Sequence, residues 1–270
     1  MKIFEGIMLI SDMDGTLLNK DGSISEKNIE AIKEFISLGG KFTVATGRMK
    51  KGVEKFLDRL PINAPAIIFN GSSIYDFSKH KEIYAKVLEN GVKGYLERIK
   101  SVDSSIGIEV YCNDEIYVYN NHKRTERFKK KGYKVHYDFN DDVYNMQWRK
   151  VLIVGDKDQL DNLQNVFQEE VGQANIVRSD DVYLEMMPMG TSKAMAVKIL
   201  CDMLKYKLED VIAVGDNMND FDMLKEVGYS FVVENGDEKL KKAIKGRTTD
   251  NNNDAIYNLL EGMKFVLINC

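Results

Sequence analysis

The sequence has few of the residues that build disulfide-rich or extended chains. Its three cysteines, Cys112, Cys201 and Cys270, are scattered over 270 residues. None has a nearby histidine at metal-ligand spacing, which argues against a disulfide framework or a zinc site and favours a reducing cytosol. Only three prolines occur, so long extended linkers are not expected.

Long hydrophobic runs and a dominant charge are also missing. No apolar run approaches the roughly 20 residues that cross a bilayer, and the run at residues 7–10 is too short for a secretory signal. A net charge of −4 gives no overall attraction to nucleic acid or to an anionic membrane. We therefore expect a cytoplasmic protein without nucleic-acid or membrane partners, present as a monomer or weak homo-oligomer.

The two ends of the chain alternate between strand and helix patterns. Apolar strands are predicted at residues 7–10, 41–45 and 66–69, with helices at 25–38 and 53–60 between them. A β-α-β-α-β order is typical of a parallel sheet covered by helices. The same alternation returns near the C-terminus. It predicts strands at 211–214 and 231–233 and helices at 193–204, 221–227, 238–244 and 253–263.

The middle of the chain has a different texture. Strands are predicted at 106–110 and 115–119 around Asn113-Asp114, a hairpin signal. Further strands are predicted at 150–154 and 183–187, and helices at 86–99 and 159–170. The basic stretch 123–134 is interpreted as a solvated helix face. We predict an α/β protein: a Rossmann-like parallel core of residues 1–81 and 188–270, with a smaller α/β domain, 82–187, inserted into it.

Four polar segments follow predicted strands or open a helix. They are Asp12–Thr16, Thr46–Arg48, Thr191–Lys193 and Gly215–Asp220. In an open parallel sheet, ligands bind beyond the carboxyl ends of the strands. The sequence therefore predicts that these segments meet at one site.

The first segment is the most specific. Asp12 and Asp14 are two residues apart at a strand end, where their side chains would share a side and repel without a cation. Oxygen ligands alone suit Mg²⁺, and one carboxylate could then attack phosphorus. Gly15 would let backbone N–H groups point at phosphate oxygens. A capping aspartate pair is the alternative, but the full Asp-x-Asp-Gly-Thr pattern favours chemistry.

The other segments add groups that phosphoryl chemistry needs. Thr46 offers a hydroxyl, and Lys193 could neutralise a phosphate and a carboxylate. Asp216 could complete a metal site, Asn219 could donate to phosphate, and Asp220 could orient Lys193 or Asn219. Taken singly, each segment also fits a plain turn, a first-turn lysine or a helix cap.

In this order the four segments resemble the motifs of the haloacid dehalogenase superfamily, and most closely its Cof-type branch with a large α/β cap of type IIB. The motifs correspond to Asp12–Thr16, to Thr46 in Val44–Arg48, to Lys193 in Gly190–Lys193, and to Gly215–Asp220. The stretch Asn70–Ile74 also resembles the family's Asn-Gly-Ala/Ser segment before the cap.

The resemblance implies roles for these residues. Asp12 would be the nucleophile, and Asp14 would protonate the leaving alcohol and then activate water, a task that calls for a raised pKa. Mg²⁺ would be held by Asp12, the backbone carbonyl of Asp14, and Asp216. The oxygens of the phosphoryl group would be held by a set drawn from all four motifs: Gly15, Thr46, Gly47, Lys193 and Asn219.

The main functional hypothesis is therefore Mg²⁺-dependent hydrolysis of a small phosphorylated metabolite, such as a sugar phosphate or a phosphorylated cofactor. Two alternatives stay open. One is a phosphosugar mutase or phosphotransferase, which would keep the phosphoryl group while a sugar reorients. The other is a non-catalytic phospho-receiver, although a receiver needs neither a leaving-group acid nor a cap.

Overall fold

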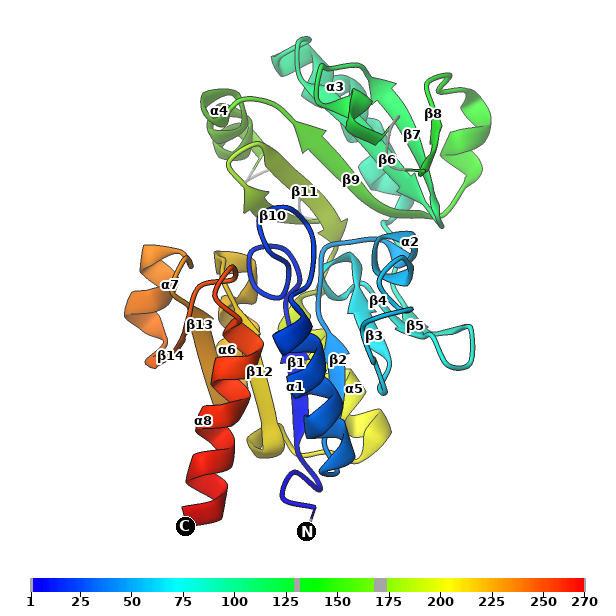
Figure 1. Cartoon of the computed structure of the whole chain (residues 1–270). Helices are drawn as coiled ribbons and strands as arrows, with labels where there is room; N and C mark the ends of the chain where they lie inside the picture. Colours follow the sequence, from blue (N-terminus) through cyan, green and yellow to red (C-terminus); the bar gives the residue numbers. More distant parts are fainter. Residues whose placement is uncertain (1, 129–131, 168–173, 270) are drawn as a thin grey trace. The chain divides into compact units, whose positions relative to one another are not determined.

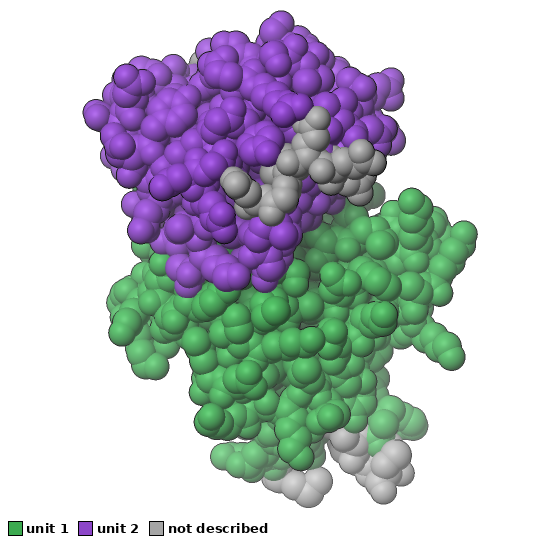
Figure 2. Space-filling model, turned by 180° about the vertical axis from the view of Figure 1, so that it is seen from behind, with its two compact units in different colours: residues 1–84, 192–270 green, residues 85–191 purple. Residues whose placement is uncertain are grey.

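The computed structural model describes residues 2–128, 132–167 and 174–269. The chain forms two compact units, one of residues 1–84 and 192–270 and the other of residues 85–191 (Figure 2). The boundaries expected from the sequence are 81/82 and 187/188. The first unit extends to Tyr84 because strand β5, Lys81–Ala85, hydrogen-bonds into a sheet of that unit.

The first unit contains a parallel five-stranded sheet in the order β14-β13-β12-β1-β2. In β1 the residues Met8, Leu9 and Ile10 have no exposed surface, as expected for a strand covered on both faces. Neighbouring β12 and β2 lie on either side of β1, with Met8 opposite Val211 and Lys41. The strands span Met8–Ser11 (β1), Lys41–Val44 (β2), Val211–Gly215 (β12), Tyr229–Val233 (β13) and Gly246–Thr248 (β14).

Helices cover both faces of this sheet (Figure 1). Helices α1 and α8 pack together on one face, while α5 and α6 share a core with Met8 and Ile10 on the other. The helices span Glu26–Ser37 (α1), Lys50–Glu54 (α2), Lys193–Leu204 (α5), Phe221–Glu226 (α6), Glu238–Ala243 (α7) and Ala255–Asn269 (α8). Helix α1 begins where predicted, because Ser25 accepts a hydrogen bond from the amide of Asn28 at 3.2 Å.

A small sheet, β3-β4-β5, continues from the edge of β2 through a parallel bridge between Ala45 and Ile67. Between β3 (Ala66–Ile68) and β4 (Ser73–Asp76) the chain makes a tight 3-10 turn, η1, over Phe69–Gly71. Neither β4 nor β5 was anticipated, since their sequence gives no clear alternation.

The second unit is a six-stranded mixed sheet in the order β10-β11-β9-β6-β7-β8. Helices α3 (Tyr95–Val102) and α4 (Lys157–Phe167) share its apolar core, which includes the fully buried Trp148. The strands span Gly107–Cys112 (β6), Glu115–Asn120 (β7), Lys134–His136 (β8), Trp148–Val154 (β9), Ala174–Asp180 (β10) and Tyr183–Pro188 (β11). The expected hairpin joins β6 to β7, with Asn113 at φ +52°.

Some predicted helices are wrong in extent. The helix expected at 53–60 is α2, which ends at Glu54 because the amides of Phe56 and Leu57 bond to carbonyls only three residues back. The helix expected at 86–99 starts as a 3-10 turn, η2, at Asn90–Gly94 and continues as α3. Helix α4 begins at Lys157, two residues before its predicted start, and residues 168–170 of the predicted range lie outside the described residues.

The basic stretch 123–134 is not a solvated helix face over its described residues. It contains a single 3-10 turn, η3, at Thr125–Phe128 and the start of β8. Within it, Arg127 forms a bidentate ion pair with Glu109, whose side chain is completely buried. The prediction of a solvated helix face is therefore wrong for these residues, because Arg127 neutralises a buried acid on β6. Among residues 2–128, 132–167 and 174–269, no helix combines the length and apolarity needed to span a membrane.

Candidate active site

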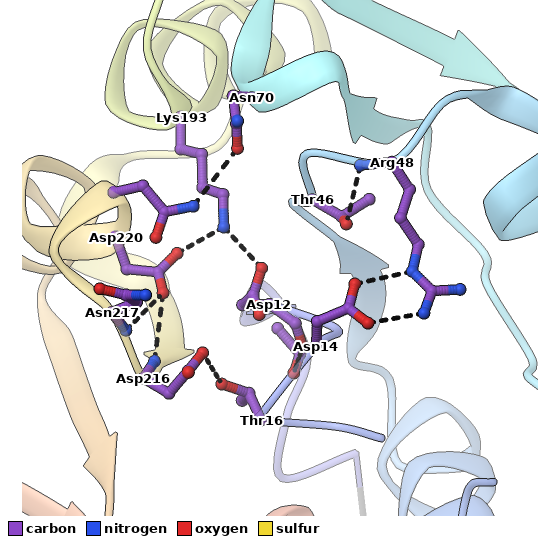
Figure 3. A network of polar contacts seen from close by, with 12 residues as sticks. Asp12, Asp14, Thr16, Thr46, Arg48, Asn70, Lys193, Asp216, Asn217 and Asp220 are labelled. Atoms are coloured by element: carbon purple, nitrogen blue, oxygen red, sulfur yellow. Dashed lines mark hydrogen bonds and ion pairs between the residues drawn. The ribbon is translucent and has the colours of Figure 1, made fainter. Parts of the chain in front are cut away.

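The predicted site residues follow the ends of adjacent strands (Figure 3). Asp12 follows β1, Thr46 follows β2, and Asp216 follows β12. Lys193 is the first residue of α5, whose N-cap, Ser192, accepts a hydrogen bond from the amide of Met195. The sheet order therefore brings to one edge side chains that are far apart in the sequence.

Lys193 lies between two carboxylates. Its Nζ is 2.5 Å from Oδ1 of Asp12 and 2.6 Å from Oδ1 of Asp220, and only 1% of its surface is exposed. Burial by itself lowers the pKa of Lys193, but the charges of Asp12 and Asp220 and their hydrogen bonds raise it above its usual value. The lysine is therefore a fixed positive charge beside Asp12. Its place at a helix start, unfavourable against the helix dipole, is offset by these two acids.

Three carboxylates crowd this position. One oxygen each from Asp12, Asp216 and Asp220 lies within 4.8 Å of the others. Burial raises the pKa of Asp12 well above its usual range, and the charges of Asp220 and Asp216 add to this against the opposing effect of Lys193. Burial, followed by the charge of Asp220, raises the pKa of Asp216 to about 7. Such a cluster is costly when fully ionised, and its hard oxygen donors suit a divalent cation.

Asp220 is already held by hydrogen-bond donors. Besides Lys193, it accepts bonds from the amides of Asp216 at 3.1 Å and Asn217 at 3.3 Å, and it has no exposed surface. A side chain on Gly215 would collide with it, since an added Cβ would lie 2.5 Å from its Cγ. The geometry therefore favours Asp220 as the residue that orients Lys193, with Asp12 and Asp216 as the carboxylates that face a cation.

Gly15 leaves room next to Asp12 and Asp216. Its φ is +82°, and an added Cβ would lie only 2.4 Å from Oδ2 of Asp216. Its carbonyl accepts a hydrogen bond from Nδ2 of Asn235 at 2.8 Å, and Thr16 donates to Oδ1 of Asp216 at 3.0 Å. The turn after β1 is thereby fixed against the turns after β12 and β13, and Gly15 places no side chain beside Asp216. The donor set and this space fit a small cation.

Asp14 differs from its expected state. Its carboxylate accepts hydrogen bonds from Nε and Nη2 of Arg48, at 2.7 and 2.6 Å, and its side chain is 63% exposed. Desolvation pushes the pKa of Asp14 up, but the hydrogen bonds and charge of Arg48 bring it below its usual value. The expectation of a raised pKa is therefore wrong for this structure. The pKa of Asp14 is lowered by Arg48, a residue that directly follows Thr46-Gly47 and has no role in the expectations from the sequence.

The remaining predicted residues surround an asparagine that was noted only as part of a motif. Thr46 is buried, and its hydroxyl accepts a hydrogen bond from the amide of Arg48 at 3.2 Å. Asn219 donates from Nδ2 to Oδ1 of Asn70 at 3.4 Å. The amide of Asn70 also lies against Gly47, where an added Cβ would be 3.0 Å from Nδ2. The signal for Asn70 in the sequence is an Asn-Gly pair directly after a strand.

Comparison with known proteins agrees with this geometry. The haloacid dehalogenase-like hydrolase family model matches residues 9–260. The chain belongs to this family. The resemblance to the Cof-type branch is confirmed, and the protein is a phosphatase of the haloacid dehalogenase type.

Three similar proteins illustrate the match. A Bacillus subtilis protein named 5-amino-6-(5-phospho-D-ribitylamino)uracil phosphatase YwtE is 26% identical over 276 residues, covering 91% of this chain and 93% of that protein. A haloacid dehalogenase-like hydrolase from Bacteroides thetaiotaomicron is 28% identical, with a TM-score of 0.82 over 95% of this chain and 99% of the other. A structure described as a subclass IIB sugar phosphatase has a TM-score of 0.83 at 17% identity, covering 96% and 99%, which shows the shared fold.

Proposed function

We propose that this phosphatase hydrolyses small phosphomonoesters, such as sugar phosphates or phosphorylated cofactors, in a Mg²⁺-dependent reaction through an aspartyl-phosphate on Asp12. The observation that carries the proposal is the position of Asp12 at the end of the inner strand β1, 2.5 Å from Lys193 and within 4.8 Å of a carboxylate oxygen of Asp216. A carboxylate that is buried beside a fixed cation and a second acid has both an electrostatic partner for a phosphate and a place for a metal ion.

The metal ion would be held by Asp12, Asp216 and the backbone carbonyl of Asp14. When bound, Mg²⁺ would neutralise charge on the incoming phosphate and on the carboxylates. The residues fit this ion because their donors are all oxygens and because Gly15 places no side chain beside Asp216.

In the proposed reaction, a carboxylate oxygen of Asp12 attacks phosphorus, and the bond from phosphorus to the ester oxygen breaks. Asp14 gives its proton to the departing alkoxide. Asp14 then takes a proton from water, whose oxygen attacks phosphorus and releases inorganic phosphate and the free Asp12 carboxylate. Gly15, Thr46, Gly47, Lys193 and Asn219 would hold the phosphoryl oxygens.

The ion pair between Asp14 and Arg48 adds a requirement to this scheme. Arg48 holds Asp14 in its ionised form, which suits the base that activates water. To act as the acid in the first step, Asp14 must exchange Arg48 for the leaving oxygen of the substrate. In the proposed reaction, Arg48 is the partner of Asp14 before substrate binds.

The decisive experiment replaces the nucleophile. Asp12→Asn should abolish Mg²⁺-dependent phosphate release from p-nitrophenyl phosphate, while leaving the fold intact by circular dichroism. The matched control is Asp58→Asn, because Asp58 is an exposed aspartate outside the site. Retained turnover in Asp12→Asn would remove the nucleophile assignment, and a wild-type rate that is unchanged by chelation of divalent ions would remove the metal.

The relatives suggest where to search for the substrate. Two Bacillus subtilis relatives, each 26% identical, are named 5-amino-6-(5-phospho-D-ribitylamino)uracil phosphatases. That compound and sugar phosphates both carry a phosphate on a polyhydroxylated chain, so a screen of phosphorylated metabolites should include both. Isomerised hexose phosphate in place of free phosphate would support the mutase alternative. Stable phosphorylation of Asp12 without turnover would support the receiver.

A further inference from the structure

The 3-10 turn η1 is the most strained segment near the site. Phe69, Asn70 and Gly71 have φ values of +50°, +50° and +96°, three successive residues in a region that L-amino acids rarely adopt. Asparagine tolerates this conformation and glycine adopts it freely, but a phenylalanine does not. Strain of this kind persists only where surrounding contacts enforce it, and it concentrates at functional sites.

The contacts that enforce the turn come from two phosphate-holding segments. The backbone N–H of Asn70 donates to the carbonyl of Thr46 at 2.9 Å, and the backbone N–H of Phe69 donates to the carbonyl of Arg48 at 3.0 Å. Gly71 lies against the start of α5, where an added Cβ would be 2.1 Å from the carbonyl oxygen of Ser192. The turn is thereby fixed between the loop after β2 and the residue that precedes Lys193.

The turn directs one polar side chain into the site. Asn70 is only 4% exposed, and in Figure 3 its side chain lies near Lys193 and above Asp12. Its Oδ1 accepts a hydrogen bond from the side chain of Asn219, in the loop after β12. Its side-chain amide also lies against Gly47, in the loop after β2. Since β12 and β2 flank β1, this amide bridges the two loops on either side of Asp12.

We propose that Asn70 is a positioning residue for phosphoryl transfer, and that the strained turn exists to hold its amide between Asn219 and Gly47. This rests on the proposed function. One N–H of the Asn219 amide is directed to Asn70, which leaves the second N–H for a phosphoryl oxygen. The 3.4 Å separation of the two amides is long for a hydrogen bond, and such contacts tighten in catalytic sites when substrate binds.

The first test is Asn70→Gly, which removes the amide but keeps a residue that adopts a φ of +50°. We expect a melting temperature no lower than that of the wild type, together with at least a tenfold lower kcat/KM for p-nitrophenyl phosphate. The matched control is Asn113→Gly, since Asn113 has nearly the same φ, +52°, in the exposed β6–β7 turn. The control should keep wild-type kinetics.

The second test asks whether Asn70 acts through Asn219. The kcat/KM of the double variant Asn70→Gly/Asn219→Ala should lie within twofold of that of Asn219→Ala, because the amide has nothing left to orient. Losses that multiply would show independent roles and overturn the proposal, as would an Asn70→Gly variant with wild-type kinetics.

A third readout separates this proposal from the proposed function. Inorganic phosphate with Mg²⁺ should raise the melting temperature of the wild type and of Asn113→Gly, and raise that of Asn70→Gly by less than half as much. If the wild type lacks turnover, the proposed function fails while this binding comparison still decides the role of Asn70. An equal shift in all three proteins counts against Asn70, whatever their turnover.

Discussion

At the scale of single residues, the two aspartates of the first motif have opposite environments. Asp12 is buried among acids, so its pKa is raised, whereas Asp14 is largely exposed and paired with Arg48, so its pKa is lowered. Identical side chains two positions apart thus have different proton affinities because their neighbours differ. The proposed roles, in which Asp12 attacks and Asp14 moves protons, therefore require a cation that keeps Asp12 ionised and the release of Asp14 from Arg48 before it acts as an acid.

The pH profile should report the pair of Asp14 and Arg48. Arg48 stabilises the ionised form of Asp14, so Arg48→Leu should raise the pKa of Asp14. Because Asp14 must be ionised to activate water, the acid limb of the kcat profile should move to higher pH. The control is Arg59→Leu, since Arg59 is paired with Glu26 at an exposed position. An acid limb that stays in place, or moves to lower pH, contradicts this role for Arg48.

At the scale of elements, turns that lack a Cβ permit close approaches between segments. The contact of Gly71 with the carbonyl of Ser192 joins η1 to the start of α5, and Gly15 lies against Asp216 in the same way. Because backbone cannot move aside as a flexible side chain can, the first contact is the more restrictive. It fixes the helix start that carries Lys193.

Replacing this glycine should therefore be costly. Gly71→Ala combines a φ of +96° with an overlap of 2.1 Å against backbone, so we expect it to lower the free energy of unfolding by about 2–4 kcal/mol. Gly262→Ala is the contrasting control, because Gly262 is helical with nothing within 4 Å of an added Cβ, and it should gain up to about 1 kcal/mol. Urea denaturation measures both. Equal effects of the two substitutions would show that the close approach is relaxed in solution.

The β7–β8 edge of the second unit should respond to acid. A hydrogen bond from Lys134 is the largest influence on Glu115, and despite some desolvation the pKa of this acid is lowered to about 2, with His136 and Tyr117 also bonded to it. Its folded pKa lies below the usual value of 4.5, so the unfolded chain binds more protons between these values. The stability from Glu115 is complete above pH 4.5 and is lost as the pH falls towards 2.

The variant Glu115→Gln removes this titration. Its free energy of unfolding should be lower than that of the wild type at pH 6, and the difference should shrink as the pH falls from 4.5 towards 2. The measurement is a series of urea titrations across that range. A difference that is constant with pH would mean that Glu115 is not ionised preferentially in the folded protein.

At the scale of the whole molecule, the proposed active-site residues all belong to one of the two units. Asp12, Asp14, Asp216 and every proposed phosphate ligand belong to residues 1–84 and 192–270. The second unit, residues 85–191, has its own apolar core and its own buried ion pairs, such as that of Lys150 with Glu185 at 2.9 Å. The proposed chemistry and the inserted sheet are thus separate in sequence and in core.

Metal binding should therefore stabilise one unit. A ligand that binds only the native form stabilises it by about 2.7 kcal/mol at a concentration of 100 Kd. Added Mg²⁺ should slow hydrogen exchange around Asp12 and Asp216 and in the strands β1 and β12, with little change in β6, β7 and β9. Asp216→Asn is the control, since it should abolish the effect. Protection of equal size in both units would contradict a metal site confined to the first.

The sequence by itself determined the strands β1, β2 and β12 and the helices α1, α5 and α6, because burial on both faces leaves continuous apolar runs and helices leave caps and periodic spacing. It was weaker where the pattern is local and ambiguous, as in β4, β5 and α2. In α2, hydrogen bonds to carbonyls three residues back decide the outcome, and in β4 and β5 it is decided by pairing with the preceding strand. The acids of the motifs could be found because they directly follow apolar strands.

Only the tertiary structure decided how the site residues meet. The pair of Arg48 and Asp14 joins positions 34 apart, Asn219 meets Asn70 across 149 residues, and Lys193 meets Asp12 across 181. No local pattern encodes these distances, since they depend on the sheet order and on the strained turn η1. The sequence therefore supplied the chemical groups, whereas the packing of β2, β1 and β12 set their charges and partners.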